Sequence, residues 1–161
     1  MEEKILTLLE KNSRLSAGDI AERLGITAAE AAAYLKKFES EGVICGYKTL
    51  INWDKTERDF VEALIEVKVA PARGNGFDKI AESIYKFDEV QAVYLMSGGY
   101  DLTVLVAGES LKDVAHFVSE KLSAMEAVLS VSTHFMLKKY KDFGVILETN
   151  KNKDERLIVS P

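Results

Sequence analysis

The sequence predicts an α+β fold, in which an N-terminal winged helix-turn-helix precedes a ferredoxin-like βαββαβ domain. Two observations lead to this prediction. Apolar residues follow helical spacing up to Gly42, and from Phe60 onward the periodicity alternates in the order strand, helix, strand, strand, helix, strand. We therefore expect a helix-turn-helix domain (1–46), a strand or linker (47–59), a ferredoxin-like domain (60–141) and a charged C-terminal tail (142–161).

Two short helices are expected before the first tight turn. The first ends near Asn12. The second spans about 17–24, where Ser16 is the N-cap and Asp19, three residues on, completes a capping-box pattern. Gly25 follows where a left-handed backbone turn is needed. These features predict the first half of a helix-turn-helix.

A third helix is expected after this turn. Thr27 is its N-cap, Glu30 stands at the matching capping-box position, and Gly42 ends it. Two helices joined by a tight glycine turn, with the small Ala21 where they cross, describe a helix-turn-helix. The inner stripe of the third helix is Ala31, Leu35 and Phe38.

The segment that follows, GVICGYKTLINW, is rich in Val, Ile, Tyr, Thr and Trp. Such residues favour a β-strand. We expect this strand to serve as a wing or as a linker to the next domain.

The outward face of the third helix is the candidate DNA-reading surface. It consists largely of alanine, whose methyl group can contact a thymine methyl but cannot discriminate bases by hydrogen bonds. Hydroxyls, lysines and the helix N-terminus remain available to phosphates. We therefore expect a helix that fits the major groove of double-stranded DNA better than it reads it. The candidate DNA-binding residues are Arg14, Ser16, Thr27, Ala28, Ala29, Ala32, Ala33, Lys36 and Lys37.

The charge distribution leaves a second interpretation open. The net charge is −5, and residues 1–52 hold seven Lys or Arg against eight Asp or Glu. Any DNA binding therefore depends on the local arrangement of charge and not on bulk attraction. The alternative is a metabolite-binding or enzymatic protein in which the helix-turn-helix is only a scaffold.

The second domain is defined by four strands and two helices. VEALIEVKV, VQAVYLMS, YDLTVLVA and VLSVSTHFMLKKY have the alternation of strands, and ARGNG is expected to be a loop. Helical spacing runs from Phe77 to Phe87 and again after Ser110, which with Asp113 forms a cap. The second helix is expected to carry Leu111, Val114, Ala115, Val118 and Leu122 on its inner face.

Both faces of the predicted sheet are apolar. The second strand has Val90, Ala92, Tyr94 and Met96 on one side and Val93 and Leu95 on the other, and Leu105 opposes the inward residues of the third strand. Helices cover only one face of such a sheet, so an apolar patch would remain exposed. A second copy of the same sheet is the expected cover, which predicts a twofold homodimer.

The stretch MSGGYDL lies where the second and third strands are joined and is the candidate effector site. Its glycines permit close backbone approach, exposed amides suit a carboxylate, and Asp101 suits an ammonium. Together they can hold the zwitterionic end of an amino acid, whereas the alternative is a plain hairpin turn. The candidate effector-binding residues are Ser97, Gly98, Gly99, Tyr100 and Asp101.

Catalysis finds little support in the sequence. The two histidines, His116 and His134, are expected at a surface or an interface, and Cys45 is the single cysteine. No metal-ligand cluster, nucleophile elbow, phosphate loop or cofactor motif is present. No apolar run approaches the roughly 20 residues that a membrane-spanning helix needs. We expect a cytoplasmic protein that is not an enzyme, has no catalytic residues and uses neither metal nor cofactor.

Taken together, four stretches resemble the Lrp/AsnC family of prokaryotic transcription regulators, also called leucine-responsive or feast/famine regulators. They are KILTLLEKNSRLSAGDIAERLGIT, KKFESEGVICGY, YLMSGGYDLTVLV and THFMLKKYK, and the resemblance covers roughly residues 2–141. Its most specific points are the segments 41–44 and 99–101.

The resemblance implies a DNA-binding regulator whose C-terminal domain senses a small molecule, usually an amino acid, bound between subunits near the loop 97–101. It also implies dimers formed through the sheets, which in this family commonly assemble into octamers. Several tethered copies can bind DNA firmly even if each helix reads weakly, because the later contacts are intramolecular.

Overall fold

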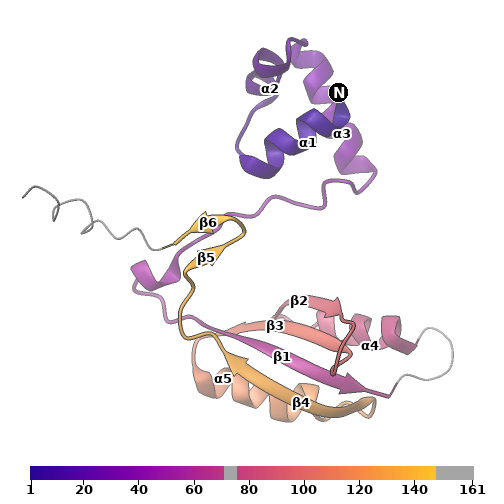
Figure 1. Cartoon of the computed structure of the whole chain (residues 1–161), viewed down its shortest axis with the longest axis vertical. Coiled ribbons are helices and arrows are strands. Elements are labelled where there is room, and N and C mark those ends of the chain that lie inside the picture. The colour runs from indigo at the N-terminus through magenta and orange to yellow at the C-terminus, as the bar shows by residue number, and fades with distance from the viewer. Residues whose placement is uncertain (71–75, 148–161) are drawn as a thin grey trace, which may run out of the picture. The chain divides into compact units, whose positions relative to one another are not determined.

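The computed structural model describes residues 1–70 and 76–147 and divides the chain into two units. The first unit is Met1–Ile51, and the second begins at Asn52. Figure 1 shows the helices of the first unit and the sheet of the second. Each unit has its own hydrophobic core among the described residues.

The first unit consists of three helices, α1 (Glu2–Lys11), α2 (Ala17–Leu24) and α3 (Ala28–Ser40). Their buried side chains come from all three helices, so the helices form one small core. The core residues are Ile5, Leu9, Ile20, Ala21, Ala31 and Phe38. Leu35, expected on the inner stripe of α3, is half-buried beside them.

Both predicted capping boxes are confirmed. Ser16 Oγ accepts a hydrogen bond from Asp19 N (3.1 Å), and the Asp19 carboxylate accepts one from Ser16 N (2.8 Å). Thr27 and Glu30 make the same reciprocal pair at α3. Between the two helices Gly25 has φ +67°, the left-handed conformation that the turn requires.

The prediction of a strand in GVICGYKTLINW is wrong. Within the described residues, the segment from Gly42 to Phe60 has no strand and only one short 3₁₀ turn, η1 (Trp53–Lys55). The physical reason is that a strand needs a neighbour for its backbone hydrogen bonds, and this segment pairs with none of the described strands.

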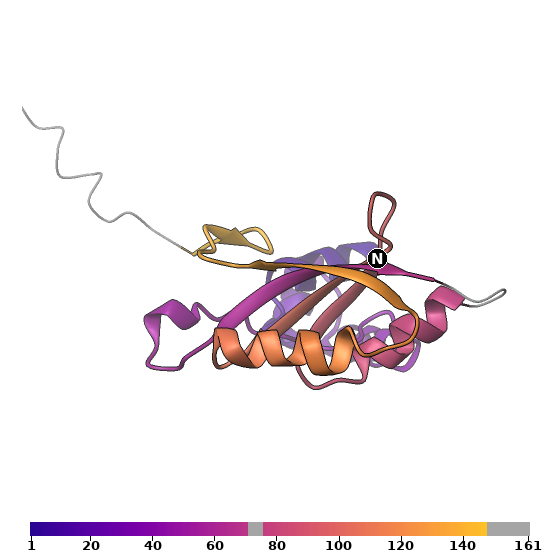
Figure 2. The same cartoon turned by 90° about the horizontal axis from the view of Figure 1, so that it is seen from below.

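The second unit contains β1 (Val61–Val69), α4 (Gly76–Tyr85), β2 (Val90–Leu95), β3 (Leu102–Gly108), α5 (Leu111–His116), η2 (Phe117–Leu122) and β4 (Val128–Phe135). The strands form an antiparallel sheet in the order β2-β3-β1-β4, which is the predicted ferredoxin-like arrangement. Both helical segments lie on the same side of the sheet (Figure 2). The expected ARGNG loop lies mostly in 71–75, outside the described residues, and its last glycine begins α4.

The core lies between this sheet and its helices. Alternate residues of β1 and β3 point inward and are fully or almost fully buried against the two helices. The inward residues of these two strands are Ala63, Ile65, Val67, Val69, Leu102, Val104 and Val106. The helices contribute Ile80, Ile84, Val114, Phe117 and Leu122.

One strand face differs from the expectation. The register of β2 against β3 shifts between Val90 and Ala92 because Gln91 forms a bulge. Val90 therefore packs on the core side together with Val93, and not beside Ala92 and Tyr94 as predicted. Simple alternation failed here because a single extra residue inverts every later side chain.

The inner face of the second helix also needs correction. Leu111 and Ala115 are exposed, and Phe117 is buried instead. From Phe117 the helix is of the π type, with Ser123 N bonded to Val118 O five residues back (2.8 Å). Leu111 and Ala115 precede this π segment, in the part of the helix where Val114 and Phe117, three residues apart, face the core. The predicted Val114, Val118 and Leu122 do contribute to the core.

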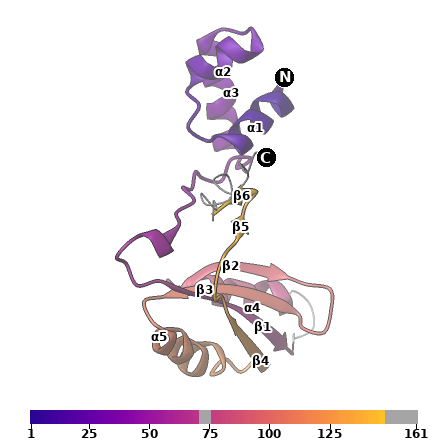
Figure 3. The same ribbon diagram turned by 60° about the vertical axis from the view of Figure 1, so that its left-hand side comes forward.

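The first residues of the expected charged tail form regular secondary structure. Lys141–Asp142 (β5) and Val145–Ile146 (β6) form a hairpin after β4, with Phe143 and Gly144 at its tip (Figure 3). Lys139 contacts the carboxylates of Glu62 and Asp142 and so ties the start of this hairpin to β1. The remaining tail, 148–161, lies outside the described residues.

The capping boxes predict how the first unit responds to acid. The pKa of Asp19 is lowered first by the side-chain hydrogen bond from Ser16, and the pKa of Glu30 first by the backbone N–H of Thr27. A carboxyl whose folded pKa is depressed stabilises the fold above its unfolded pKa, and this stabilisation is lost as the pH falls through the folded pKa. We expect a double variant, Asp19→Asn with Glu30→Gln, to melt lower at neutral pH and to lose less stability below about pH 4.5.

Thermal melts followed by circular dichroism across a pH series measure this effect. Glu22→Gln is the matched control, because Glu22 is an exposed acid on α2 and caps neither helix. Equal acid sensitivity of the double variant and the parent would contradict the role of the two boxes.

Candidate functional site

The exposed face of α3 is the first candidate surface. Ala28, Ala29, Ala32, Ala33 and Lys36 are all exposed, whereas Ala31 and Phe38 on the opposite side are buried. The helical repeat brings the alanines and Lys36 onto one side of the helix. The helix thus presents a smooth, narrow face of methyl groups that ends in one cation.

The two hydroxyls assigned to phosphates are already engaged. Ser16 Oγ donates to Asp19 Oδ2 (2.6 Å), and Thr27 Oγ1 donates to Glu30 Oε2 (2.8 Å). The capping bonds hold both carboxyl pKa values below their ordinary range, with the Ser16 hydroxyl and the Thr27 N–H as the largest causes. The carboxyl groups of Asp19 and Glu30 are therefore ionised at neutral pH. Their negative charge lies where a phosphate would approach the N-termini of α2 and α3.

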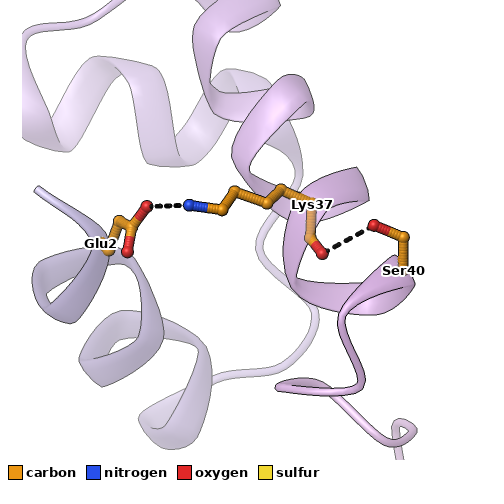
Figure 4. A network of polar contacts seen from close by, with 3 residues as sticks. All are labelled: Glu2, Lys37 and Ser40. Carbon is orange, nitrogen blue, oxygen red and sulfur yellow. Dashed lines mark hydrogen bonds and ion pairs between the residues drawn. The ribbon is translucent and has the colours of Figure 1, made fainter.

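Lys37 is also partly committed within the unit. Its Nζ lies 2.7 Å from Glu2 Oε1, and Ser40 Oγ donates to the Lys37 carbonyl at 2.9 Å (Figure 4). The Glu2 carboxylate, first through this hydrogen bond, raises the pKa of Lys37. This exposed pair joins α3 to α1. By contrast, the side chains of Lys36 and Arg14 form no hydrogen bond or ion pair within the described residues.

A groove of the first unit was not found by sequence reasoning. It has a volume of about 520 Å³ and lies between α1 and the segment 43–48. Its apolar side chains include Leu6, Leu9, Val43 and Ile44, with Glu3, Glu10 and Lys48 among the polar ones. No sequence pattern connects its two sides, because they are separated by most of the helix-turn-helix.

The loop 96–101 is the second candidate site, and it is fastened to β1. Met96 N donates to Asp101 O (2.8 Å), and Asp101 N donates to Val67 O (3.0 Å). The Asp101 carboxylate accepts a hydrogen bond from Val69 N (2.9 Å) and faces Lys68 Nζ, which lies 3.6 Å from Oδ1. Sequence analysis did not identify Lys68 as a site residue, because the alternation along β1 indicates only that its side chain points outward from the sheet.

The two glycines of this loop are not required by its own conformation. Neither Gly98 nor Gly99 has a positive φ, and a Cβ added at either position would meet nothing within 4 Å. A larger residue would therefore fit both places within the described residues. The open space leaves the loop backbone accessible to a group from outside.

The sheet face opposite the helices is the third candidate surface. Its register aligns Ala92, Leu105, Leu64 and His134 in one row across the four strands. Beside this row Tyr94 is exposed, and His134 Nε2 lies 3.1 Å from Glu66 Oε2. The face is thus apolar over β2 and β3, and it becomes polar toward β4.

Neither a metal-ion cluster nor a membrane-spanning helix is found in the part of the chain that is described. Among those residues, no group of three His, Cys, Asp or Glu side chains is arranged to hold a metal ion. None of the described helices has the length and apolar character needed to span a bilayer. His116 and His134 are both exposed, and the one cysteine, Cys45, is exposed and free.

Comparison with family models identifies both units. Residues 62–146 match the Lrp/AsnC ligand binding domain, and residues 1–44 match a winged helix-turn-helix DNA-binding domain. The match to the ligand binding domain includes β1, the loop 96–101 and the hairpin β5–β6.

Known proteins similar to this chain are transcription regulators. The chain is 49% identical over 161 residues to the uncharacterized HTH-type transcriptional regulator YugG of Bacillus subtilis, covering 99% of this chain and 96% of that protein. It is 25% identical to a proline dehydrogenase transcriptional activator of Rhizobium radiobacter, covering 88% and 90%.

Solved structures agree in fold. A transcriptional regulator of Neisseria meningitidis, crystallised as a complex with L-Met, superposes with a TM-score of 0.70 at 25% identity, covering 88% of this chain and 90% of that one. AsnC of E. coli superposes with a TM-score of 0.65 at 20% identity, covering 86% and 91%. The second likeness supports the fold alone.

Proposed function

The chain belongs to the Lrp/AsnC family of transcription regulators, and we propose that it binds double-stranded DNA through α3 under the control of an amino acid. A helix-turn-helix regulator with a ligand binding domain is not an enzyme, and this excludes the enzymatic part of the alternative interpretation. We expect a regulator that acts on DNA in this way to work in the cytoplasm.

The observation that carries the DNA-binding proposal is the exposed alanine face of α3. A face of methyl groups gives a helix clearance to enter the major groove while offering no hydrogen bonds to base edges. Phosphate contacts then fall mainly to Arg14 and Lys36, whose side chains are unpaired within the described residues. Ser16, Thr27 and Lys37 contribute only where a phosphate displaces Asp19, Glu30 or Glu2.

Weak reading by one helix is compatible with firm binding by an assembly. In a dimer or octamer, each further helix–DNA contact is intramolecular and benefits from a high effective concentration. Selectivity can then come from the deformability of the DNA that several helices bend together. The apolar area of the open sheet face, formed by Leu64, Ala92, Tyr94 and Leu105, supports a dimer made through that face.

The ligand proposal rests on the loop 97–101. Its backbone is accessible beside Gly98 and Gly99, and Asp101 fixes it to β1. The Neisseria relative binds L-Met, which supports an amino acid as the class of effector here. We assign Ser97, Gly98, Gly99, Tyr100 and Asp101 to this site.

The first test changes the cation at the end of the α3 face. Lys36→Ala should weaken binding about equally for a target fragment and for its shuffled sequence, and it should lower the salt slope by roughly one unit for each phosphate that the lysine neutralises. Ala33→Leu should obstruct groove entry although the alanine makes no hydrogen bond. Fluorescence anisotropy over a salt series measures both effects, using the fragment most enriched by genome-wide recovery of bound DNA.

Lys86→Ala is the matched control, because Lys86 is an exposed lysine of the second unit paired with Glu82. If Lys36→Ala no longer binds the enriched fragment but still binds its shuffled sequence, α3 reads bases and the phosphate assignment is wrong. If Ala33→Leu binds both DNAs normally, α3 does not enter the groove and the helix-turn-helix acts as a scaffold.

A second test addresses assembly. We expect the protein to be at least dimeric at micromolar concentration, and Leu105→Asp to dissociate it, because a carboxylate would be buried without a partner on the joined sheets. Light scattering measures the mass, and circular dichroism checks the fold. Leu111→Asp is the control, since Leu111 is an exposed leucine on the helix side. A monomeric parent protein would rule out the dimer.

A third test addresses the ligand. Gly98→Ala and Gly99→Ala should leave the melting temperature without ligand unchanged or slightly raised, since the added methyl meets no described residue within 4 Å. Each should reduce the thermal shift that the parent protein shows with its amino acid, found by screening the twenty. A normal ligand response in both variants would show that no ligand approaches this backbone.

A further inference from the structure

Asp101 is engaged by groups of its own chain. Its Oδ2 accepts the Val69 N–H at 2.9 Å, its Oδ1 faces Lys68 Nζ at 3.6 Å, and its side chain is only 21% exposed. Its backbone N–H also donates to Val67 O at 3.0 Å. The residue therefore clamps the loop to β1 through a mostly buried carboxylate, whose Oδ1 is charge-paired with Lys68 without a hydrogen bond.

Lys68 is the accessible charge of the same site. Its side chain is 42% exposed, and its Nζ donates to Gly99 O at 3.2 Å. An ammonium has three donors, and the distance to Asp101 is longer than a hydrogen bond, so donor capacity remains after the bond to Gly99. The next outward residue of β1, Glu66, is paired with His134 and does not reach Lys68.

The surroundings of Lys68 leave room for an anion. The bond to Gly99 O places the ammonium next to the two glycines, where an added Cβ would meet none of the described residues within 4 Å. A carboxylate can approach there and accept hydrogen bonds from a cation and from loop amides together.

We propose that Lys68 is the anion-binding residue of this loop and receives the carboxylate of the effector, with Asp101 as a positioning residue. This inference rests on the proposed ligand site and adds the residue and the chemical group that selects the ligand. The carboxylate is then essential, whereas the α-ammonium contributes little because Lys68 and Val69 already serve Asp101.

The ligand series that tests this compares three molecules on the full-length protein by calorimetry. They are the amino acid that gives the largest thermal shift, its 2-oxo acid and its decarboxylated amine. We expect the 2-oxo acid to bind within about tenfold of the amino acid and the amine not to bind. Binding of the amine in preference to the 2-oxo acid would overturn the proposal.

Variants separate the role of Lys68 from a general loss of structure. Lys68→Met should weaken the binding of the amino acid by about tenfold or more, and Lys68→Arg should restore most of the affinity. Lys86→Met is the control, and circular dichroism should be unchanged in all three. Parent-like affinity of Lys68→Met would overturn the assignment.

Asp101→Asn tests the positioning role, because the amide oxygen can still accept the Val69 N–H while the charge is removed. Asp101→Asn should change the affinities for the amino acid and for the 2-oxo acid by the same factor, because the α-ammonium does not depend on the Asp101 charge. Loss of amino-acid binding with retention of 2-oxo acid binding would place the ammonium on Asp101 and overturn the proposal. If the parent protein binds neither ligand, the proposed effector site itself is wrong. If the parent binds and Lys68→Met binds equally well, only the role of Lys68 is wrong.

Discussion

The alternation of side chains along β1 is the constraint on which the second unit depends. This strand pairs with β3 on one edge and β4 on the other, and its inward residues Ala63, Ile65, Val67 and Val69 are buried in the core. A shift by one residue would exchange these side chains with Glu62, Glu66 and Lys68, at the cost of burying three charges. The register of β1 is therefore strongly fixed.

The outward residues of the same strand connect the other parts of the unit. Glu62 binds Lys139 before the terminal hairpin, Leu64 lies in the apolar row, Glu66 meets His134, and Lys68 reaches the loop 96–101. A ligand at that loop would thus act on the strand that also carries the proposed dimer face. This shared strand offers a physical route between ligand and assembly, because one rigid element takes part in both.

The first unit combines firm local structure with little base-reading capacity. Two capping boxes fix the N-termini of α2 and α3, and their carboxylates set a negative charge at each helix start. The same residues that stabilise the helices therefore weaken the attraction of those ends for phosphates. A regulator built in this way would gain DNA affinity from several copies, which we propose join through the apolar sheet face of the second unit.

The sequence by itself determined the three helices of the first unit, the order of elements from β1 to β4, both capping boxes, the Gly25 turn and the alanine face of α3. These depend on residues within a few positions of one another. Only the tertiary structure decided where Val90 and Phe117 point, since a bulge changes the periodicity of β2 without a sequence signal, and packing against the sheet selects Phe117 over Ala115. It also decided the partners of Lys37, Lys68 and Asp101, whose hydrogen bonds join residues 31 to 35 positions apart. Such contacts follow from strand register and helix packing, and no local spacing contains them.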